Sequence, residues 1–400
     1  MPRLPFALAT SCILLAGPTV RIAPKGTAVS SRDLIAITDV AVVSMLSDRA
    51  VEGQTVLVEG GRIRAVGSAA RVRIPNGARR IDGRGAWLMP ALTDMHVHLR
   101  PSDVPAYLAN GIGTVRNMWG HDAIVRMRRA ADSLGGLRIH SASAGLDGTP
   151  PQWPGTVLVT APESAAAAVR GQAESPAGWE YIKVYSRLSP AAFDAIMREI
   201  RARRLVAVGH VPLAVDVRHA LASGMRSVEH LTGYDRAVSV ARQGGTWAWT
   251  DADTTRFAAL VELTRRTGAW NCPTLAIYRR LAAGQGPAHE AAATRSRRHF
   301  VRLLHAAGAP VVAGSDAGID VVPAGTSLHD ELAELVAAGL SPYEALRAAT
   351  VLPARFFGDS AAGTIREGAN ADLLLLEGNP LDDVANARRI RTMILRGRVL

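Results

Sequence analysis

The chain has 400 residues, of which 48% are apolar and 20% charged, a composition that fits a globular protein and excludes general disorder. Its formal charge of +11 would suit nucleic-acid binding, but the arginines are dispersed and no zinc-finger, RNA-binding or basic-tract signature accompanies them. We therefore predict a small-molecule substrate as the partner, and no nucleic acid.

The N-terminal segment has the features of a secretory signal. Arg3 precedes a mostly apolar stretch, residues 4–17, which is too short to span a bilayer. We predict that residues 1–28 are a signal peptide and leader, and that the mature protein is a bacterial periplasmic or secreted protein without a stable membrane span. Cys12 follows Ala9-Thr10-Ser11, a poor lipoprotein motif, so lipid attachment stays open. Without this segment only Cys272 remains, which excludes an internal disulfide and which we interpret as a small buried apolar residue.

Short β-rich runs occupy both ends of the remaining chain. Gly60-Gly61 separates two of them and predicts a hairpin, and Gly397 closes the last. The runs are residues 35–37, 56–58, 63–66, 372–376 and 392–395. We predict that residues 34–86 and 362–400 together build one small β-sandwich.

The middle of the chain alternates between strand-like and helical runs. The strand-like runs are residues 87–92, 113–118, 137–142, 181–185, 205–211, 227–231, 270–275 and 310–313. The helical runs are residues 122–134, 162–173, 190–203, 254–266 and 291–307. Eight strands alternating with helices favour an α/β fold, a closed (β/α)8 TIM barrel over residues 87–361. Residues 278–299 are a candidate lid.

Lysine usage points to unusual chemistry at one position. The chain has only two lysines, Lys25 and Lys183, and Lys183 lies inside the apolar run Tyr181-Ile182-Lys183-Val184-Tyr185. Unlike arginine, a desolvated lysine can lose its proton and act as a nucleophile. A lysine carboxylated by CO2 is an anion able to bridge two metal ions.

Candidate metal ligands lie at the ends of the predicted strands. In Asp94-Met95-His96-Val97-His98, strand alternation places the acid and both histidines on one face. Because the C-terminal ends of barrel strands meet at one mouth, we expect six residues to converge there. They are His96, His98, Lys183, His210, His230 and Asp316. Imidazoles and carboxylates suit zinc and related ions. We interpret His121, His140, His219, His289, His299 and His305 as ordinary core or surface histidines.

This pattern resembles the amidohydrolase superfamily, specifically its imidazolonepropionase-like and prolidase-like branch. The resemblance covers nearly the whole chain after the leader. The matching segments are residues 89–98, 182–185, 209–211, 229–231, 314–316, 368–373 and 378–381. Ala91 stands where the family usually has Gly, and the loop at 144–148 lacks the histidine of well-known dipeptidases. The substrates of those dipeptidases therefore cannot be assigned directly to this protein.

The resemblance implies a mechanism with two divalent ions, Zn²⁺ or else Mn²⁺, Co²⁺ or Ni²⁺. His96, His98 and Asp316 would hold one ion and His210 and His230 the other, with the carbamate of Lys183 and a hydroxide bridging them. Asp316 would act as the general acid and base. Asp94 would either support the ligands or be a structural carboxylate. Tyr185, Tyr234 and His329 are candidate substrate contacts against a packing or surface role.

We predict a binuclear amidohydrolase that cleaves amide or peptide-like C–N bonds, for example in dipeptides or N-acyl amino acids. A lactonase or phosphotriesterase remains an alternative, since the same centre attacks those bonds. A mononuclear cyclic amidase or deaminase is a third, which Lys183 disfavours. A catalytically inactive assembly protein would be expected to lack ligands, and none of the six is missing. The sequence leaves the substrate, the native metal and homo-oligomer formation open.

Overall fold

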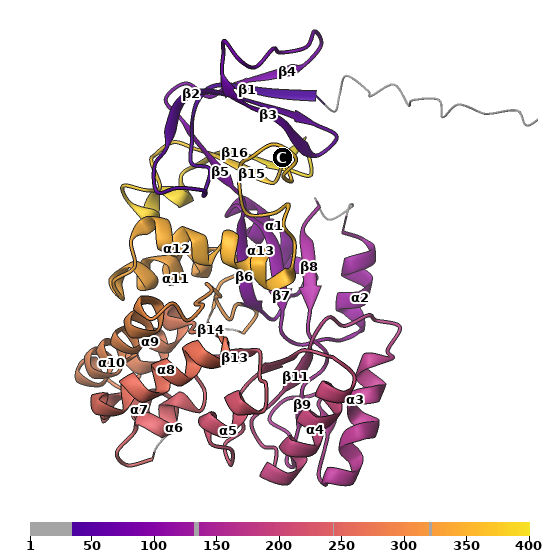
Figure 1. The fold of residues 1–400 in the computed structure, drawn as a ribbon, viewed down its shortest axis with the longest axis vertical. Helices are drawn as coiled ribbons and strands as arrows, with labels where there is room; N and C mark the ends of the chain where they lie inside the picture. The colour runs from indigo at the N-terminus through magenta and orange to yellow at the C-terminus, as the bar shows by residue number, and fades with distance from the viewer. Residues whose placement is uncertain (1–33, 132–135, 243, 320–321) are drawn as a thin grey trace, which may run out of the picture.

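The computed structural model describes residues 34–131, 136–242, 244–319 and 322–400 (Figure 1). The predicted signal segment and Cys12 lie outside the described residues. Within those ranges, no helix combines the length and the apolar character needed to cross a membrane.

Strands from both ends of the chain share one eight-stranded sheet, at the top of Figure 1. Its strands are β1 (Leu34–Val42), β2 (Val51–Glu59), β3 (Arg62–Ser68), β4 (Arg79–Asp82), β5 (Trp87–Pro90), β15 (Leu373–Leu376), β16 (Ile390–Leu395) and β17 (Arg398–Val399). The predicted hairpin is confirmed, because Glu59 pairs with Arg62 and the intervening Gly60 and Gly61 have φ of 55° and 76°. Apolar residues such as Ile37, Val56 and Leu375 form its core. A two-layered sandwich stays a prediction.

The run expected as the first barrel strand divides between two sheets. β5 pairs antiparallel with β15, whereas β6 (Leu92–Val97) pairs parallel with β7 (Ile112–Asn117). The change of partner occurs at Ala91, whose N–H bonds Asp372 O at 2.8 Å, while Leu92 N–H bonds Gly111 O at 2.9 Å. The interpretation of residues 87–92 as one barrel strand is therefore corrected. The apolar character continues unbroken through the switch, so hydropathy alone does not mark it.

The remaining strands are parallel and lie below the terminal sheet in Figure 1. β6, β7 and β8 (Arg138–Ser141) form one sheet. The second runs in the order β10 (Val157–Leu158), β9 (Leu146–Asp147), β11 (Ile182–Val184), β12 (Ala207–Gly209), β13 (Ser227–Glu229) and β14 (Trp270–Cys272). Single parallel bridges join Ala142 to Tyr181, Asn271 to Val311 and Val97 to Ala317. The eighth predicted strand, residues 310–313, is represented only by the bridge at Val311.

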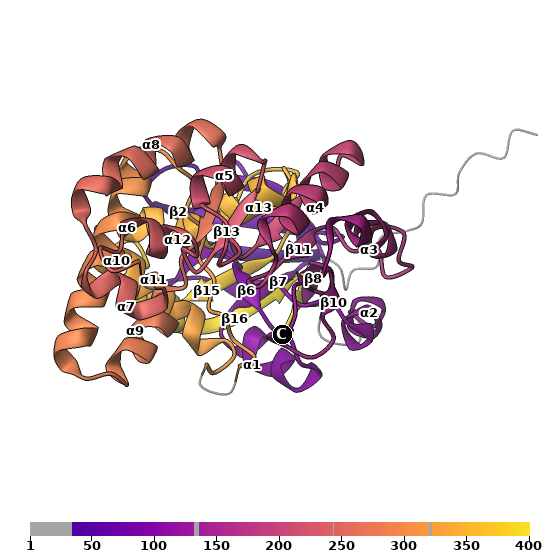
Figure 2. The same cartoon turned by 90° about the horizontal axis from the view of Figure 1, so that it is seen from below.

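Helices surround the parallel strands, as the view in Figure 2 shows. They are α1 (Val104–Ala109), α2 (Asp122–Arg129), α3 (Ala165–Ala173), α4 (Pro190–Ala202), α5 (Val217–Ala222), α6 (Tyr234–Val238), α7 (Gly245–Thr250), α8 (Phe257–Thr267), α9 (Leu275–Ala283), α10 (Pro287–Ala306), α11 (Thr326–Ala337), α12 (Pro342–Ala348) and α13 (Val351–Phe357). Short 3₁₀ helices span Pro101–Asp103, Pro162–Ser164, Thr254–Arg256 and Val384–Arg388. Each of the five predicted helical runs contains a helix, although α2 ends at Arg129 and residues 132–134 of that run lie outside the described residues. The candidate lid, residues 278–299, comprises parts of α9 and α10 and the turn between them.

Local sequence explains where these helices begin. Ser189 accepts a hydrogen bond from Ala192 N–H, and Pro190 occupies the first helical position of α4. Ser341 and Glu344 form a capping box at α12. The apolar faces of the helices pack on the parallel strands in one large core, so the strand ends are held rigidly.

Candidate metal centre

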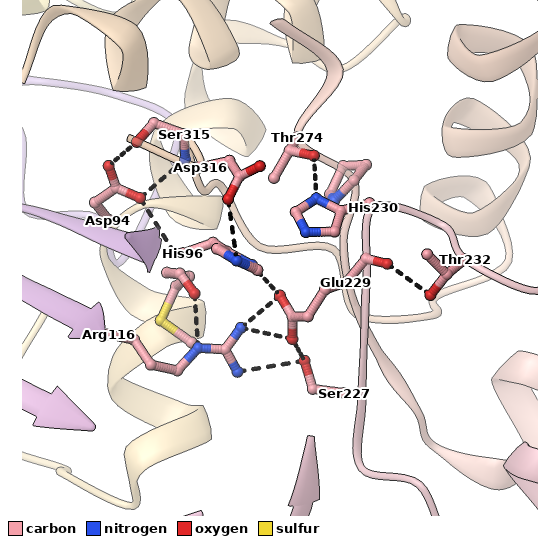
Figure 3. Close-up of polar contacts among 12 residues, drawn as sticks. Asp94, His96, Arg116, Ser227, Glu229, His230, Thr232, Thr274, Ser315 and Asp316 are labelled. Atoms are coloured by element: carbon pink, nitrogen blue, oxygen red, sulfur yellow. Dashed lines mark hydrogen bonds and ion pairs between the residues drawn. The ribbon is translucent and has the colours of Figure 1, made fainter. Parts of the chain in front are cut away.

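Four histidines and one aspartate meet at the C-terminal ends of the parallel strands. His96 lies within β6, and His98, His210 and His230 lie one residue beyond β6, β12 and β13. Nε2 of His96 and Nε2 of His98 lie 3.2 and 3.3 Å from Oδ1 of Asp316. The ring of His230 lies 4.5 Å from that of His96 and 4.9 Å from that of His210, centroid to centroid. The structure thus brings these five predicted residues together; Figure 3 shows His96, His230 and Asp316 among them.

Lys183 projects from β11 into an aromatic setting and is fully buried. Its Nζ lies 5.2 Å from the ring centroids of both Trp119 and Tyr185. The ring of Tyr185 in turn stacks on that of His210 at 4.2 Å. Lys183 therefore lies beside the histidine cluster.

Nζ of Lys183 is buried without a hydrogen-bond partner among the described residues. Nε2 of His96 is buried too and makes no hydrogen bond there, although it lies 3.2 Å from Oδ1 of Asp316. Buried polar atoms are rarely left unsatisfied, because desolvation without a partner is unfavourable. Donor atoms of His96, His98 and Asp316 all lie within 4.8 Å of one another, and they are of the types that divalent metals prefer. The residues present therefore fit a metal ion.

The other ring nitrogen of three histidines is already engaged. Nδ1 of His96 lies 2.8 Å from Oε2 of Glu229. Nδ1 of His210 lies 2.9 Å from Ser186 Oγ, and Nδ1 of His230 lies 2.8 Å from Thr274 Oγ1. Such contacts fix the ring and leave Nε2 available to a metal. They were not predicted from the sequence.

Glu229 belongs to a buried charged network that sequence reasoning missed. Its carboxylate accepts hydrogen bonds from Arg116 Nη2 at 2.8 and 2.9 Å and from the hydroxyl of Ser227. Burial by itself would raise the pKa of Glu229, but Arg116 and His96 lower it to about 2. The carboxylate therefore stays anionic beside His96. The sequence did contain a signal for this network, namely one charged residue within each of two strand-like runs, Arg116 in β7 and Glu229 in β13.

Asp94 ties β6 to the loop that carries Asp316. Its carboxylate accepts from Ser315 N at 2.9 Å, Ser315 Oγ at 2.5 Å and His96 N at 3.2 Å, as Figure 3 shows. Burial raises the pKa of Asp94 to about 7, opposed by the hydrogen bonds from Ser315. With its oxygens committed to the loop, Asp94 supports the site.

Burial also sets the charge of the cluster itself. It lowers the pKa of His98 to about 4, that of His230 to about 3 and that of His210 well below its ordinary value. Burial would raise the pKa of Asp316, but the neighbouring His230 and His96 hold it well below the usual range. Neutral imidazoles around an anionic carboxylate are the forms that bind metal.

The backbone is strained at several of these positions. His230, Asp316 and Thr274 have φ of 60°, 60° and 47°, in the left-handed region that non-glycine residues rarely occupy. Beside them, a Cβ on Gly209 would lie 2.2 Å from Val184 O, so only glycine fits next to His210. Such strain persists only where tertiary contacts enforce it.

A pocket of about 480 Å³ opens over the cluster. Its lining comprises His98, Leu99, Arg100, Asn117, Trp119, His121, Gln152, Trp153, Pro154, Tyr185, His210, His230, Ile277, Tyr278, Leu281, Asp316, Gly318 and Ile319. His121, interpreted from the sequence as an ordinary histidine, lines it. So does Tyr185, whose hydroxyl accepts from Trp153 Nε1 at 2.7 Å.

Two candidate substrate contacts lie elsewhere, and this corrects the sequence interpretation. Tyr234 is fully buried and its hydroxyl lies 2.7 Å from Thr264 Oγ1. His329 Nε2 lies 3.0 Å from Asn110 O. Both lie on helices that face the core, where each forms a hydrogen bond with a neighbouring residue.

Cys272 lies close to His96 and Glu229 but packs as an apolar residue. Burial raises its thiol pKa well above the ordinary value, so the thiol remains protonated. Both oxygens of Glu229 are already bonded, which leaves no second metal group there.

Comparison with known proteins is consistent with this geometry. The chain is 25% identical over 205 residues to ochratoxinase of Aspergillus niger, a match that spans 50% of this chain but only 38% of that enzyme. A solved structure from Bifidobacterium longum, described as a prolidase, superposes with a TM-score of 0.74 at 25% identity over 92% of this chain and 94% of that one. A Xaa-Pro dipeptidase structure with bound methionine gives 0.73 at 19% identity over 92% and 99%. These likenesses indicate a TIM-barrel-like α/β fold.

The match to a family extends further along the sequence. The profile of the amidohydrolase family covers residues 87–400, which contain every candidate ligand. The chain belongs to the amidohydrolase family.

Proposed function

We propose that this protein, a hydrolase acting on carbon–nitrogen bonds, cleaves amide or peptide-like bonds in small apolar substrates by means of two divalent metal ions. Family membership and the similarity to ochratoxinase and to a prolidase support amide hydrolysis. One observation carries the metal assignment. Nζ of Lys183 is buried without a hydrogen-bond partner among the described residues, beside a cluster of four imidazoles and Asp316.

The ligands divide into two groups. His96, His98 and Asp316 would hold one ion, since their donor atoms lie within 4.8 Å of one another. His210 and His230 would hold the other, with Lys183 between the two. When bound, divalent cations lower the pKa of water and polarise a carbonyl group. Zinc suits these donors best, and manganese, cobalt and nickel also fit.

Lys183 would contribute an anion made from CO2. Burial lowers the pKa of Lys183 from 10.5 to about 8, although Glu229 and Asp316 oppose the shift. The neutral amine forms an N–C bond with CO2 and releases one proton to solvent, which leaves a carbamate. This would turn a buried amine that has no hydrogen-bond partner among the described residues into an anion of the kind that binds divalent metals.

Asp316 would move the proton during hydrolysis. Its histidine neighbours hold its pKa well below the usual range, so the side chain is ionised, the form that a general base requires. It also lines the pocket in which the substrate would bind. Asp94 and Ser315 keep the loop of Asp316 in place.

The pocket walls favour an apolar or aromatic group in the substrate. Trp119, Trp153, Tyr185 and Tyr278 supply rings, and α9 adds Ile277 and Leu281. Aromatic and aliphatic walls bind flat apolar groups through burial and ring contacts. We therefore expect N-acyl amino acids or dipeptides that carry bulky apolar side chains.

The full architecture belongs to the same proposal. A closed (β/α)8 barrel with a terminal sandwich accounts for the position of the ligands at one mouth. Support comes from the three parallel bridges, which link β8 to β11, β14 to Val311 and the 317 loop to β6.

The experiment combines metal analysis with a substrate screen. We expect about two metal ions per chain and turnover of N-acyl or dipeptide amides, with bulky apolar side chains preferred over charged ones. Asp316→Asn should abolish turnover, whereas His140→Gln, on β8 and stacked on Phe357 at 3.7 Å, should not. Exclusive turnover of lactones or phosphotriesters, or one metal with deaminase activity, would overturn the proposal.

A further inference from the structure

The corner between β14 and α9 holds the residue that bonds His230. Thr274 immediately precedes α9 and has φ 47° and ψ 51°. A side chain in this position usually caps the helix by accepting from its first N–H groups. Thr274 does not, because its hydroxyl lies 2.8 Å from His230 Nδ1 (Figure 3). The N-terminus of α9 therefore needs another acceptor.

Glu331 supplies that acceptor from α11. Its Oε2 accepts a hydrogen bond from Ala276 N at 2.8 Å, and its side chain is fully buried. The cap of α9 is thus provided by a distant helix, and Thr274 is left to orient His230.

Arg297 of α10 binds the same corner from the other side. Its Nη2 donates to His230 O at 3.1 Å and to Pro273 O at 2.9 Å, and the residue is only 2% exposed. Its guanidinium lies 4.0 Å from the ring centroid of Tyr278, a pocket residue on α9. Within the described ranges, no carboxylate lies within 4.0 Å of it.

We propose that Arg297 and Glu331 are positioning residues: they hold the β14–α9 corner so that Thr274 orients His230 and Tyr278 keeps its place in the pocket wall. The inference rests on the proposed role of His230 as a metal ligand. The helices α9, α10 and α11 contact one another, so both side chains reach the corner from a rigid support (Figure 1).

Packing alone does not account for this pair of buried polar side chains. Burying polar groups is unfavourable unless they find hydrogen-bond partners, and apolar residues of similar volume would stabilise a helix interface as well or better. Here each side chain instead bonds main-chain atoms of one strained corner, where His230 and Thr274 have φ of 60° and 47°. Contacts of this kind are what hold a strained backbone in a single conformation.

The test uses metal titration of the metal-free enzyme, followed by kinetics of the reloaded enzyme. We expect Arg297→Met and Glu331→Met to bind one metal equivalent normally and the second about 10–100-fold more weakly, as changes behind a ligand typically do. KM should rise together with this loss, since Tyr278 shifts. Arg297→Lys and Glu331→Gln, which keep a donor and an acceptor, should restore most of the affinity.

Arg298→Met is the matched control. Arg298 lies on the same helix and bonds Glu334 of α11 at 2.9 and 2.7 Å, away from the corner. It should lower the melting temperature but leave metal binding and KM unchanged. Normal second-equivalent binding in Arg297→Met, or equal weakening in Arg298→Met, would overturn the inference. If Arg297→Met does not fold, the test is the binding of the second metal equivalent by Glu331→Gln compared with Glu331→Met. Equal binding by these two variants would overturn the inference.

His230→Ala separates this inference from the proposed function. If His230→Ala keeps both metal equivalents, the ligand assignment itself fails. If it loses the second equivalent while Arg297→Met and Glu331→Met keep it, only the positioning role fails.

Discussion

Nδ1 of His96 lies 2.8 Å from Oε2 of Glu229, and both side chains are fully buried. Glu229 is itself held by Arg116, which bonds its two oxygens at 2.8 and 2.9 Å. The orientation of one proposed ligand therefore depends on an ion pair between β7 and β13, two strands that are distant in sequence.

This contact predicts the effect of Glu229→Gln. The neutral amide leaves Arg116 buried without a counter-charge and weakens the contact to His96. We expect a loss of about 3–5 kcal/mol in the free energy of unfolding and about 10–100-fold weaker metal binding. Denaturant unfolding and metal titration measure both. Glu180→Gln, which breaks the partly exposed pair with Arg128, should change stability by roughly 0–1 kcal/mol and leave metal binding intact.

Replacing Lys183 tests the bridging carbamate. Lys183→Arg keeps the positive charge but cannot react with CO2, so we expect loss of the two-metal centre and a fall in turnover of more than about 100-fold. Lys183→Ala should be equally inactive, and short carboxylic acids in solution should restore part of its activity. Near-normal metal content and turnover in Lys183→Arg would contradict the binuclear mechanism.

The formation of the carbamate should depend on the lowered pKa of Lys183. Because burial lowers its pKa to about 8, the reactive neutral amine accumulates as the pH rises through that value. At constant CO2 pressure, the ¹³C carbamate signal of metal-free enzyme should rise with pH and be absent in Lys183→Arg. At any given pH and CO2 pressure it should exceed the signal expected for an amine with the ordinary lysine pKa of 10.5, and an equal signal would mean that the amine is solvated.

Acid should destabilise the metal-free protein through its buried histidines. Burial lowers the pKa of His98 to about 4 and of His230 to about 3, so the unfolded chain binds protons at higher pH than the folded one. Their contribution to stability is complete above pH 6.5 and is lost as the pH falls toward 4. His230→Gln should reduce the slope of unfolding free energy between pH 4 and 6 by about 1.4 kcal/mol per pH unit. An unchanged slope would show that His230 is already protonated or solvated.

Trp153 offers a test of substrate preference. Its ring lines the pocket and its Nε1 bonds the hydroxyl of Tyr185 at 2.7 Å. Trp153→Ala should lower kcat/KM for bulky apolar substrates about 10-fold or more, while small substrates lose less, because the burial of apolar surface is what is removed. Trp247→Ala is the control, since this exposed tryptophan packs on His289 and lies outside the pocket lining. Equal losses for large and small substrates would argue against an apolar wall.

The sequence located five of the helices and most of the strand-like runs, because amphipathic periodicity and turn residues are local properties. The division at Ala91 was not predictable in this way, since the apolar run from Trp87 to Leu92 continues across it and the two sides differ in their hydrogen-bonding partners. The proposed ligands could be identified because they combine unusual residue types with strand ends. Glu229, Ser186 and Thr274 were missed because their partners are set by tertiary packing. Tyr234 shows the converse, a polar residue whose hydroxyl is satisfied inside the core.

The terminal sheet can be completed only after the last part of the chain has been synthesised. Strand β5 pairs with β15, which follows it by about 280 residues in the chain. At ribosomal speeds of 5–20 residues per second, roughly 15–60 s pass before β15 is synthesised. Throughout that time one edge of β5, including the apolar Leu88 and Met89, lacks its final neighbour. Unpaired edges of this kind recruit strands from other chains. High-level expression should therefore produce aggregates that slower translation or a holding chaperone relieves.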